Sequence, residues 1–409
     1  MSVIATANDI REQAAQRFAQ LGWPSTKLEE WKYTNVAPIA RVNWRVDDVE
    51  RVLDPSAAEG GHFAAADGLR TRPTFVFVNG RGATSATSHP LFAKYADYMR
   101  HPFVALNTAN AQDGALIVIP DGEIVDGFID VRFIGEGDPS ASLSAGGVWS
   151  HPRNLIVVGR NAQVRIVETY TGRGRYFTNA VTEIVAGDGA IVDHTKLECE
   201  SAEAFHVGTV QIHQERASSV TARTIAFGGA LVRNETNVAL KGEGASLTLD
   251  GLFVLSGRQH VDNQTLIDHA RPHCDSMELY KGILDDSARG IFDGRIIVRP
   301  DAVKTNSRQI NHNLLLSETA IVDSKPTLEI HNDDVKCNHG STIGQLDEDA
   351  MFYLRARGIG EIDARNLLVY AFASEIVDRI KTDAVREQVR RALFAQMPGR
   401  LPEQRESPR

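Results

Sequence analysis

A cysteine and a histidine two residues apart, Cys337 and His339, are the strongest candidates for chemistry in this sequence. Side chains at positions i and i+2 of an extended strand point to the same side, so a strand here would place the thiol and the imidazole on one face. Thiolate and imidazole together suit soft or borderline metals such as iron and zinc. Two ligands do not complete a tetrahedral site, so a metal needs further ligands from elsewhere, including another chain. The alternative is that both are ordinary structural residues of a strand.

Two charge effects on thiols can be read from neighbouring residues. Lys336 precedes Cys337, and a nearby ammonium lowers the pKa of a thiol and favours the reactive thiolate. Cys199 instead lies between Glu198 and Glu200. Flanking carboxylates raise the pKa of a thiol, so we expect Cys199 to be inert.

Histidines gather in the second half of the sequence. Stacking of successive coils in a solenoid would bring several of them near one another, and such a group either binds a metal or forms hydrogen-bonded ladders along the coil. We favour the ladders. The residues concerned are His260, Asp262, His269, His273, Cys274, His312 and His331.

Several motifs of common enzyme classes are absent from the sequence. It contains no G-x-x-x-x-G-K-[ST], and therefore no P-loop for nucleotide phosphates. It also contains no C-x-x-C, H-E-x-x-H or G-x-S-x-G. Neither an autonomous zinc site nor an α/β-hydrolase triad is indicated.

The elements that must position Cys337 and His339 are short β-rich runs between about residues 115 and 342. Four clusters of small and polar turn residues recur at a spacing of roughly 26 to 29 residues, a period typical of a solenoid. No helical pattern separates these runs, which argues against a doubly wound βαβ sheet. A β-sandwich is the alternative, but the length and the shared turn pattern favour a parallel β-helix. The clusters are residues 159–162, 187–190, 216–219 and 242–245.

Helical patterns flank this region. Apolar residues at helical spacing follow a capping box at Thr6 and Asp9. After Gly344, acidic residues open a helix that Gly358 can cap, and a strongly apolar helix follows from near Glu361. We therefore expect a mainly β protein with an N-terminal helical and mixed domain at 1–110, a parallel β-helix core at 111–345 and a C-terminal helical domain at 346–409.

The amino-acid composition argues against several classes of binding partner and cellular location. The 409 residues carry a formal charge of −9, which disfavours nucleic-acid binding and a polybasic membrane anchor. Three cysteines cannot form a disulfide framework. No apolar run of about 18 residues and no secretory signal are visible, so we expect no membrane span and a cytoplasmic location.

Residues 336–342 (KCNHGST), continuing through 344–347 and 352–359, resemble the signature of SufD in the SufB/SufD family of iron–sulfur cluster assembly scaffold proteins. Residues 31–34 (WKYT) are similar to the family's N-terminal helical region, and 331–335 to the approach to its C-terminal motif. The Asn-His-Gly after Cys337 and the chain length resemble SufD more than SufB. Asn338 stands where serine is common, a small polar exchange.

The resemblance implies a right-handed parallel β-helix and a complex with SufB and two copies of the ABC ATPase SufC, within which this chain is a non-catalytic scaffold. It implies that His339 faces a SufB cysteine, with Cys337 beside it, and that both serve a transient iron–sulfur cluster. The SufC contact maps to the C-terminal helices. The family's complex has been linked to flavin, for which no motif is present here. The residues expected at the SufC contact are Leu367, Leu368, Tyr370, Phe372 and Ile376.

Two other functions fit a β-helix. A polysaccharide-active enzyme would use acidic and basic side chains on one exposed sheet, but a charge of −9 repels polyuronates. A purely structural partner protein would use Cys337 and His339 only for packing. The sequence leaves open whether the isolated chain is a monomer or a homodimer, because exposed β-helix edges can pair with each other.

Overall fold

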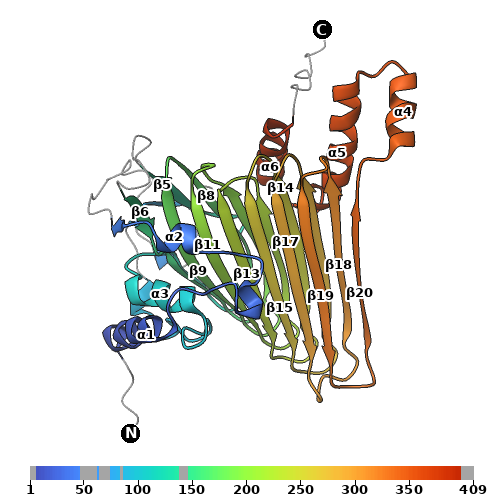
Figure 1. Cartoon of the computed structure of the whole chain (residues 1–409). Coiled ribbons are helices and arrows are strands. Elements are labelled where there is room, and N and C mark those ends of the chain that lie inside the picture. The colour runs from blue at the N-terminus through green and yellow to red at the C-terminus, as the bar shows by residue number, and fades with distance from the viewer. Residues whose placement is uncertain (1–5, 47–61, 64–73, 83–85, 138–145, 398–409) are drawn as a thin grey trace, which may run out of the picture.

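The computed structural model describes residues 6–46, 62–63, 74–82, 86–137 and 146–397, and within them the chain coils into a parallel β-solenoid with helices toward both termini (Figure 1). From β7 (Arg153–Val158) to β20 (Lys336–Gly344), successive strands alternate between two sheets. Neighbouring strands within each sheet are parallel. The predicted mainly β architecture with flanking helices is confirmed, and the β-sandwich alternative is wrong.

The strands form two sheets, here named A and B. Sheet A contains β1 (Trp44–Val46), β2 (His62–Phe63), β4 (Leu116–Ile119), β6 (Gly147–Ser150), β7, β9 (Tyr176–Ala186), β11 (Phe205–Gln214), β13 (Leu231–Leu240), β15 (His260–His269), β17 (Arg289–Val298) and β19 (Ile321–Ile330). Sheet B contains β3 (Thr74–Val78), β5 (Ile129–Glu136), β8 (Gln163–Arg173), β10 (Ile191–Cys199), β12 (Ser219–Ala226), β14 (Ser246–Leu255), β16 (Asp275–Leu284), β18 (Asn306–Leu315) and β20. Both sheets thus include short strands that precede residue 111.

One turn recurs at the same place in successive coils and explains the sequence repeat. Its backbone N–H donates to the next coil, as Asn161 does to the Asp188 carbonyl and Gly189 to the Arg216 carbonyl, both at 2.8 Å. The alanines that follow, Ala162 and Ala190, are fully buried. A left-handed residue followed by a small one is therefore required once per coil. The left-handed residues are Asn161, Gly189, Ala217, Gly244, His273 and Lys304.

The interior between the sheets is filled mainly by branched apolar side chains from the inward positions of each strand. Burying one isoleucine in this way stabilises the fold by about 1.5–3 kcal/mol. Stacked isoleucines therefore hold the coils together along the solenoid. They include Ile117, Ile156, Ile166, Ile184, Ile212, Ile267 and Ile296.

The N-terminal region covers the outer face of sheet A. The guanidinium of buried Arg233, on β13, lies 3.8 Å from the ring centroid of Trp31. The Thr34 hydroxyl donates to Asp262 on β15 at 2.5 Å. The aromatic and charged segment near residue 31 therefore packs against the solenoid and ties the N-terminal region to sheet A. The N-terminal elements are α1 (Ala7–Leu21), which has the predicted capping box, η1 (Glu29–Trp31), α2 (Ala37–Ala40), η3 (Ala86–Ser88) and α3 (Pro102–Asn110).

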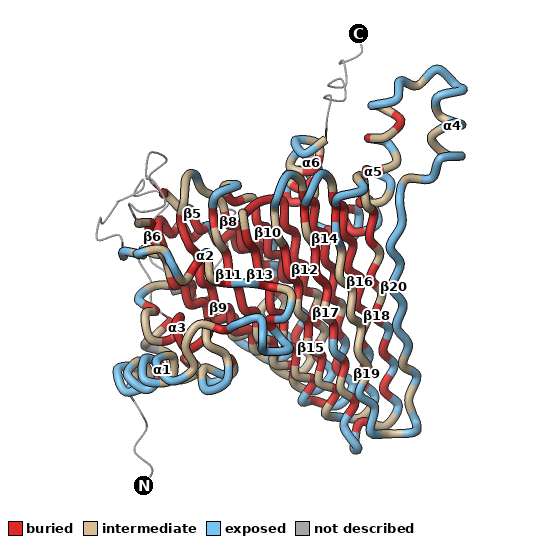
Figure 2. Tube along the Cα trace, viewed as in Figure 1, coloured by how far each residue is buried: buried red, intermediate tan, exposed pale blue. Residues whose placement is uncertain are grey.

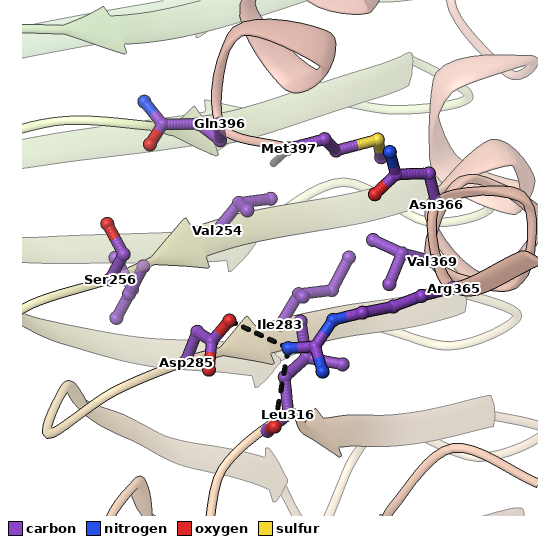
Figure 3. A pocket seen from close by; sticks show the side chains of 11 residues that line it. Val254, Ser256, Ile283, Asp285, Leu316, Arg365, Asn366, Val369, Gln396 and Met397 are labelled. Carbon is purple, nitrogen blue, oxygen red and sulfur yellow. Dashed lines mark hydrogen bonds and ion pairs between the residues drawn. The ribbon is translucent and has the colours of Figure 1, made fainter. Parts of the chain in front are cut away.

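The C-terminal helices cover part of the outer face of sheet B. Apolar residues of α5 (Glu361–Val377) and α6 (Asp383–Ala395) pack on outward residues of sheet B, and Ile376 is fully buried there. Arg365 of α5 donates to Asp285 at 2.8 Å beside a small cavity under the helices (Figure 3). α4 (Glu348–Ala356) projects away from the sheets and ends before Gly358, which has the predicted left-handed conformation (Figure 1). Across the described ranges, no helix combines the length and the apolar character needed to cross a membrane.

Candidate metal centre at the open end of the solenoid

Cys337 and His339 both lie on β20, and both point toward the interior side of sheet B. Cys337 is in register with Ser307, and His339 is in register with Gln309, on the neighbouring strand β18. Ser307 and Gln309 are buried inside the solenoid. Because residues in register on parallel strands face the same way, the predicted common face for the thiol and the imidazole is confirmed.

No further coil covers this face within the part of the chain that the structure describes, because β19 and β20 are the last strands of their sheets. His339 points inward and is nevertheless exposed, whereas Cys337 is half-buried against the apolar core between the sheets. Figure 2 shows β20 as exposed along most of its length. The imidazole is therefore open to solvent or to a docking chain.

The pKa of the Cys337 thiol is raised, whereas the neighbouring Lys336 predicted a lowered one. Burial raises its pKa above the usual range, and a backbone hydrogen bond with Ser307 only partly offsets that effect. The expected influence of Lys336 is wrong. Consecutive strand residues point to opposite faces, and Lys336 is in register with exposed Asn306. A metal ion or a partner's positive charge is what would favour the thiolate here.

A layer of polar side chains lies directly beneath the site. The Gln309 amide donates to the Glu278 carboxylate at 2.7 Å. The hydroxyls of Ser276 and Ser307 are 2.7 Å apart, and the Nε2 atom of His269 lies 2.9 Å from the Ser276 hydroxyl. The floor of the site is thus hydrogen-bonded rather than apolar.

This polar layer was not predicted, although the sequence contains a signal for it. The patterns Ser-x-Glu-x-Tyr at 276–280, Ser-x-Gln-x-Asn at 307–311 and Cys-x-His-x-Ser at 337–341 occupy equivalent positions of three successive coils. Alternation of polar residues at inward positions marks a hydrated or ligand-binding interior, because buried polar groups need partners. Burial raises the pKa of Glu278 to about 7.

The predicted histidine ladder is wrong. His260 lies 2.9 Å from the Thr34 hydroxyl on the outer face of sheet A, while His269 points inward to Ser276. The strand register explains the separation, because no two of these histidines are in register on neighbouring strands. The remaining members lie elsewhere: His312 with Thr342, His331 with Glu329, His273 in a turn, and Cys274 buried near the Gly242 carbonyl.

Cys199 has the raised pKa that its neighbours predicted. Burial is the main cause, and the charges of Glu198 and Glu200 add to it, giving a thiol pKa of about 12. This cysteine therefore stays protonated near neutral pH.

Three of the residues expected at a partner contact are engaged within the chain. Tyr370 stacks on Phe394 of α6 with centroids 5.3 Å apart. The Lys281 ammonium lies 4.4 Å from the centroid of Phe372. Ile376 is fully buried against sheet B. These side chains orient α5 on the solenoid.

The other expected contact residues face outward. Leu367 is 40% exposed, and Leu368 is partly exposed. The same end of the molecule presents Phe352 and Tyr353 on α4, with 75% and 56% of their surface exposed, and Ile362 at the start of α5. An exposed apolar set on two adjacent helices is typical of a protein-binding surface. We call Phe352, Tyr353, Ile362 and Leu367 the α4–α5 surface.

The chain is similar to known proteins along most of its length. Residues 141–372 match the SufBD core domain of SUF-system FeS cluster assembly, and residues 2–59 match the SufBD protein N-terminal region. The chain is 32% identical to an iron–sulfur cluster assembly SufBD family protein of Synechocystis, over 94% of this chain and 89% of that protein. It is 28% identical to the iron–sulfur cluster assembly protein SufD of Escherichia coli, over 95% and 92%. It is 26% identical to SufD of Bacillus subtilis, over 94% and 92%.

Proposed function

Because the chain belongs to the SufBD family of iron–sulfur cluster assembly proteins, we propose that it is a non-catalytic scaffold subunit that supplies His339 to a cluster built between two chains. The observation that carries this proposal is the position of His339, which faces inward on the last coil and is still exposed. Cys337 lies two residues away on the same face and is the second candidate ligand. Two ligands leave a cluster half-coordinated, so a partner must supply the rest.

The partner that fits this end is a SufB-like homologue whose own coils continue the solenoid. The outer edges of β19 and β20 offer backbone groups for strand pairing. Ile321, Ile330 and Ile343, on these two strands, are exposed large apolar residues that such a contact would bury. A partner stacked here would cover His339 and exclude water from a nascent cluster.

We further propose that a SufC-like ABC ATPase docks on the C-terminal helices. The chain has no P-loop of its own, so ATP-driven motion must come from another subunit. The α4–α5 surface, with Leu368 beside it, is the apolar docking area. Because Ile376 and Phe372 hold α5 firmly on sheet B, movement of the helices would reach the solenoid end that carries His339.

The cluster in this proposal is transient cargo shared with the partner. We assign no flavin site to this chain. We propose a cytoplasmic location, which suits the free thiols of Cys199, Cys274 and Cys337, since cytosolic reductants keep thiols reduced.

The experiment that tests the proposal is co-expression of this chain with SufB-like and SufC-like subunits, followed by anaerobic cluster reconstitution. His339→Ala should abolish cluster formation while the three subunits still co-purify. His331→Ala is the matched control, because His331 is also exposed and lies at the same end of the solenoid but pairs with Glu329. It should leave the cluster yield unchanged.

A normal cluster yield from the His339→Ala complex would refute the ligand role. If the Cys337→Ser/His339→Ala double variant also assembled normal clusters, the chain would be a purely structural partner. Turnover of a polyuronate by the purified chain would instead support the polysaccharide-active alternative.

A further inference from the structure

The inward column of sheet B that ends at His339 contains an unused hydrogen-bond acceptor one strand beneath the imidazole. Glu278 on β16, Gln309 on β18 and His339 on β20 follow one another in register. Neighbouring parallel strands lie about 4.8 Å apart, so side chains in register are within reach of the next one along the column. Gln309 therefore has two neighbours in this column, a buried carboxylate on one side and an exposed imidazole on the other.

The two ends of the Gln309 amide are used differently. Its Nε2 atom donates to Oε2 of Glu278 at 2.7 Å, and because an ionised carboxylate can only accept, the nitrogen must face that side. The nearby Thr265 hydroxyl also interacts with Glu278. The Oε1 atom of Gln309 is buried and makes no hydrogen bond within the described residues. A buried acceptor without a donor is costly, so we expect a partner for this oxygen.

The opposite wall of the interior holds the amide in place without offering it a polar side chain. Gly294 and Phe292, both on β17, meet it there. A Cβ atom on Gly294 would lie 2.4 Å from Nε2 of Gln309 and 2.7 Å from the Phe292 ring, so the missing side chain leaves the space that the amide fills. Of the two in-register neighbours of Gln309, His339 is the one with an N–H that can donate to Oε1.

The imidazole is able to turn toward Gln309. His339 is exposed, and β20 is the last strand of its sheet among the described residues, so packing does not lock its side chain. No hydrogen bond joins the two side chains in the described structure, but the strand spacing brings the ring within reach of the amide oxygen once the His339 torsions change. A ring nitrogen that donates to an amide oxygen keeps its proton, which leaves the other nitrogen with the lone pair that a metal needs.

We propose that Gln309 is a positioning residue whose Oε1 atom accepts a hydrogen bond from the protonated ring nitrogen of His339 and so fixes the tautomer and orientation of the imidazole. The ligand is thereby prepared before a partner or a cluster arrives. The hydrogen bond is a property of this chain alone, whereas its consequence for cluster binding rests on the proposed function of His339. Outer partners of metal-ligating histidines contribute about 10- to 100-fold to metal affinity or activity.

The tautomer of His339 in the isolated full-length chain tests the hydrogen bond without any metal. Nitrogen-15 NMR of histidine-labelled chain distinguishes protonated from unprotonated ring nitrogens, and the signals of His339 are those lost in His339→Ala. At about pH 9 an ordinary imidazole is neutral and Glu278, with a pKa of about 7, is ionised, so the wild type should show one tautomer. Gln309→Met keeps most of the side-chain volume and removes the amide, so it should show the tautomer mixture of a histidine peptide.

Two further variants separate positioning from packing. Glu278→Gln/Gln309→Glu exchanges the two side chains, keeps the net charge and still offers His339 an acceptor, so it should restore the single tautomer. Asn313→Leu removes another buried amide of β18, which is in register with Ile343, and should leave the tautomer of His339 unchanged.

The same variants in the reconstituted complex test the consequence for the cluster. Gln309→Met should lower the cluster yield about 10- to 100-fold, and the exchanged pair should recover most of it. Normal yield from a folded Gln309→Met complex would overturn the positioning role. Normal yield from His339→Ala would instead refute the ligand role and leave the tautomer result unaffected.

The NMR spectra decide whether the hydrogen bond exists. A wild-type tautomer mixture equal to that of the peptide would overturn it, and this measurement does not need any variant of Gln309 to fold. A single tautomer that persists in folded Gln309→Met would also overturn it.

Discussion

His339 stands one strand beyond Gln309 in the same inward column of sheet B. Gln309 is fully buried and donates to Glu278, whereas His339 is exposed, because no further coil lies above it among the residues that the structure describes. The column therefore changes from a buried hydrogen-bonded amide to an open imidazole over a single step of the solenoid. The end of the coil, rather than a pocket in its side, creates the candidate site.

The thiol of Cys337 should react slowly in the isolated chain. Burial raises its pKa, so the thiolate fraction near neutral pH is below that of an ordinary cysteine. Alkylation of the Cys199→Ser/Cys274→Ser variant with iodoacetamide measures Cys337 alone. We expect a rate below that of a free cysteine peptide, rising with pH beyond the range where the peptide has levelled off. A rate equal to that of the peptide at pH 7 would contradict the raised pKa.

Glu278 should make the stability of the chain depend on pH. Burial raises its pKa from 4.5 to about 7, so between these values the folded chain holds a proton that the unfolded chain has released. The resulting stabilisation is complete below pH 4.5 and is lost as the pH rises through 7, a change of about 3 kcal/mol. Denaturant unfolding of the wild type and of Glu278→Gln at several pH values gives the free energy of unfolding of each protein. The difference between the two free energies, followed against pH, measures the contribution of Glu278. A difference that is constant with pH would show that Glu278 titrates normally.

The contact between the Trp31 ring and Arg233 should contribute strongly to the stability of the fold. Replacing Trp31 by Ala removes a buried ring that covers Arg233, and a cost of about 3–5 kcal/mol is expected. Lys325→Ala is the control, since Lys325 and Glu29 form an exposed pair between the same two regions and such pairs contribute below about 1 kcal/mol. Chemical denaturation compares them. If both variants lost a similar amount of unfolding free energy, the aromatic contact would be unimportant for stability.

The isolated chain should form a homodimer through the edges of β19 and β20. These edges are unpaired in the described residues, and exposed Ile343 lies on one of them. Ile343→Lys should shift the sedimentation profile to monomer. Ile124→Lys places the same charge at an even more exposed isoleucine far along the solenoid and should leave the dimer intact. A monomeric wild type at micromolar concentration would count against this edge as an association surface.

Docking of the ATPase should depend on the α4–α5 surface. Phe352→Asp places a charge where the most exposed aromatic ring of α4 would meet an apolar partner, and co-purification of the SufC-like subunit should fall at least tenfold. Leu28→Asp is the control at an exposed apolar residue of the N-terminal region. If both complexes retained the ATPase, the docking surface would lie elsewhere.

Local patterns were enough to predict much of the site's position. The Cys-x-His spacing placed both side chains on one face because strand alternation is a property of the backbone itself. The turn clusters indicated coils because each coil needs a left-handed residue and a small one at the same point. Contacts between coils were not predictable in this way. The histidines were expected to gather, but the register sends His260 outward to Thr34 and His269 inward to Ser276.

By itself the sequence determined the repeat, the strand faces and the helix ends, since these follow from periodicity, turn chemistry and capping within a few residues. Only the tertiary structure decided which of the described coils is last and which polar columns line up beneath His339. Those features depend on the register between strands about one coil apart in sequence. Register is set by the packing of the whole core, and no short stretch of sequence contains it.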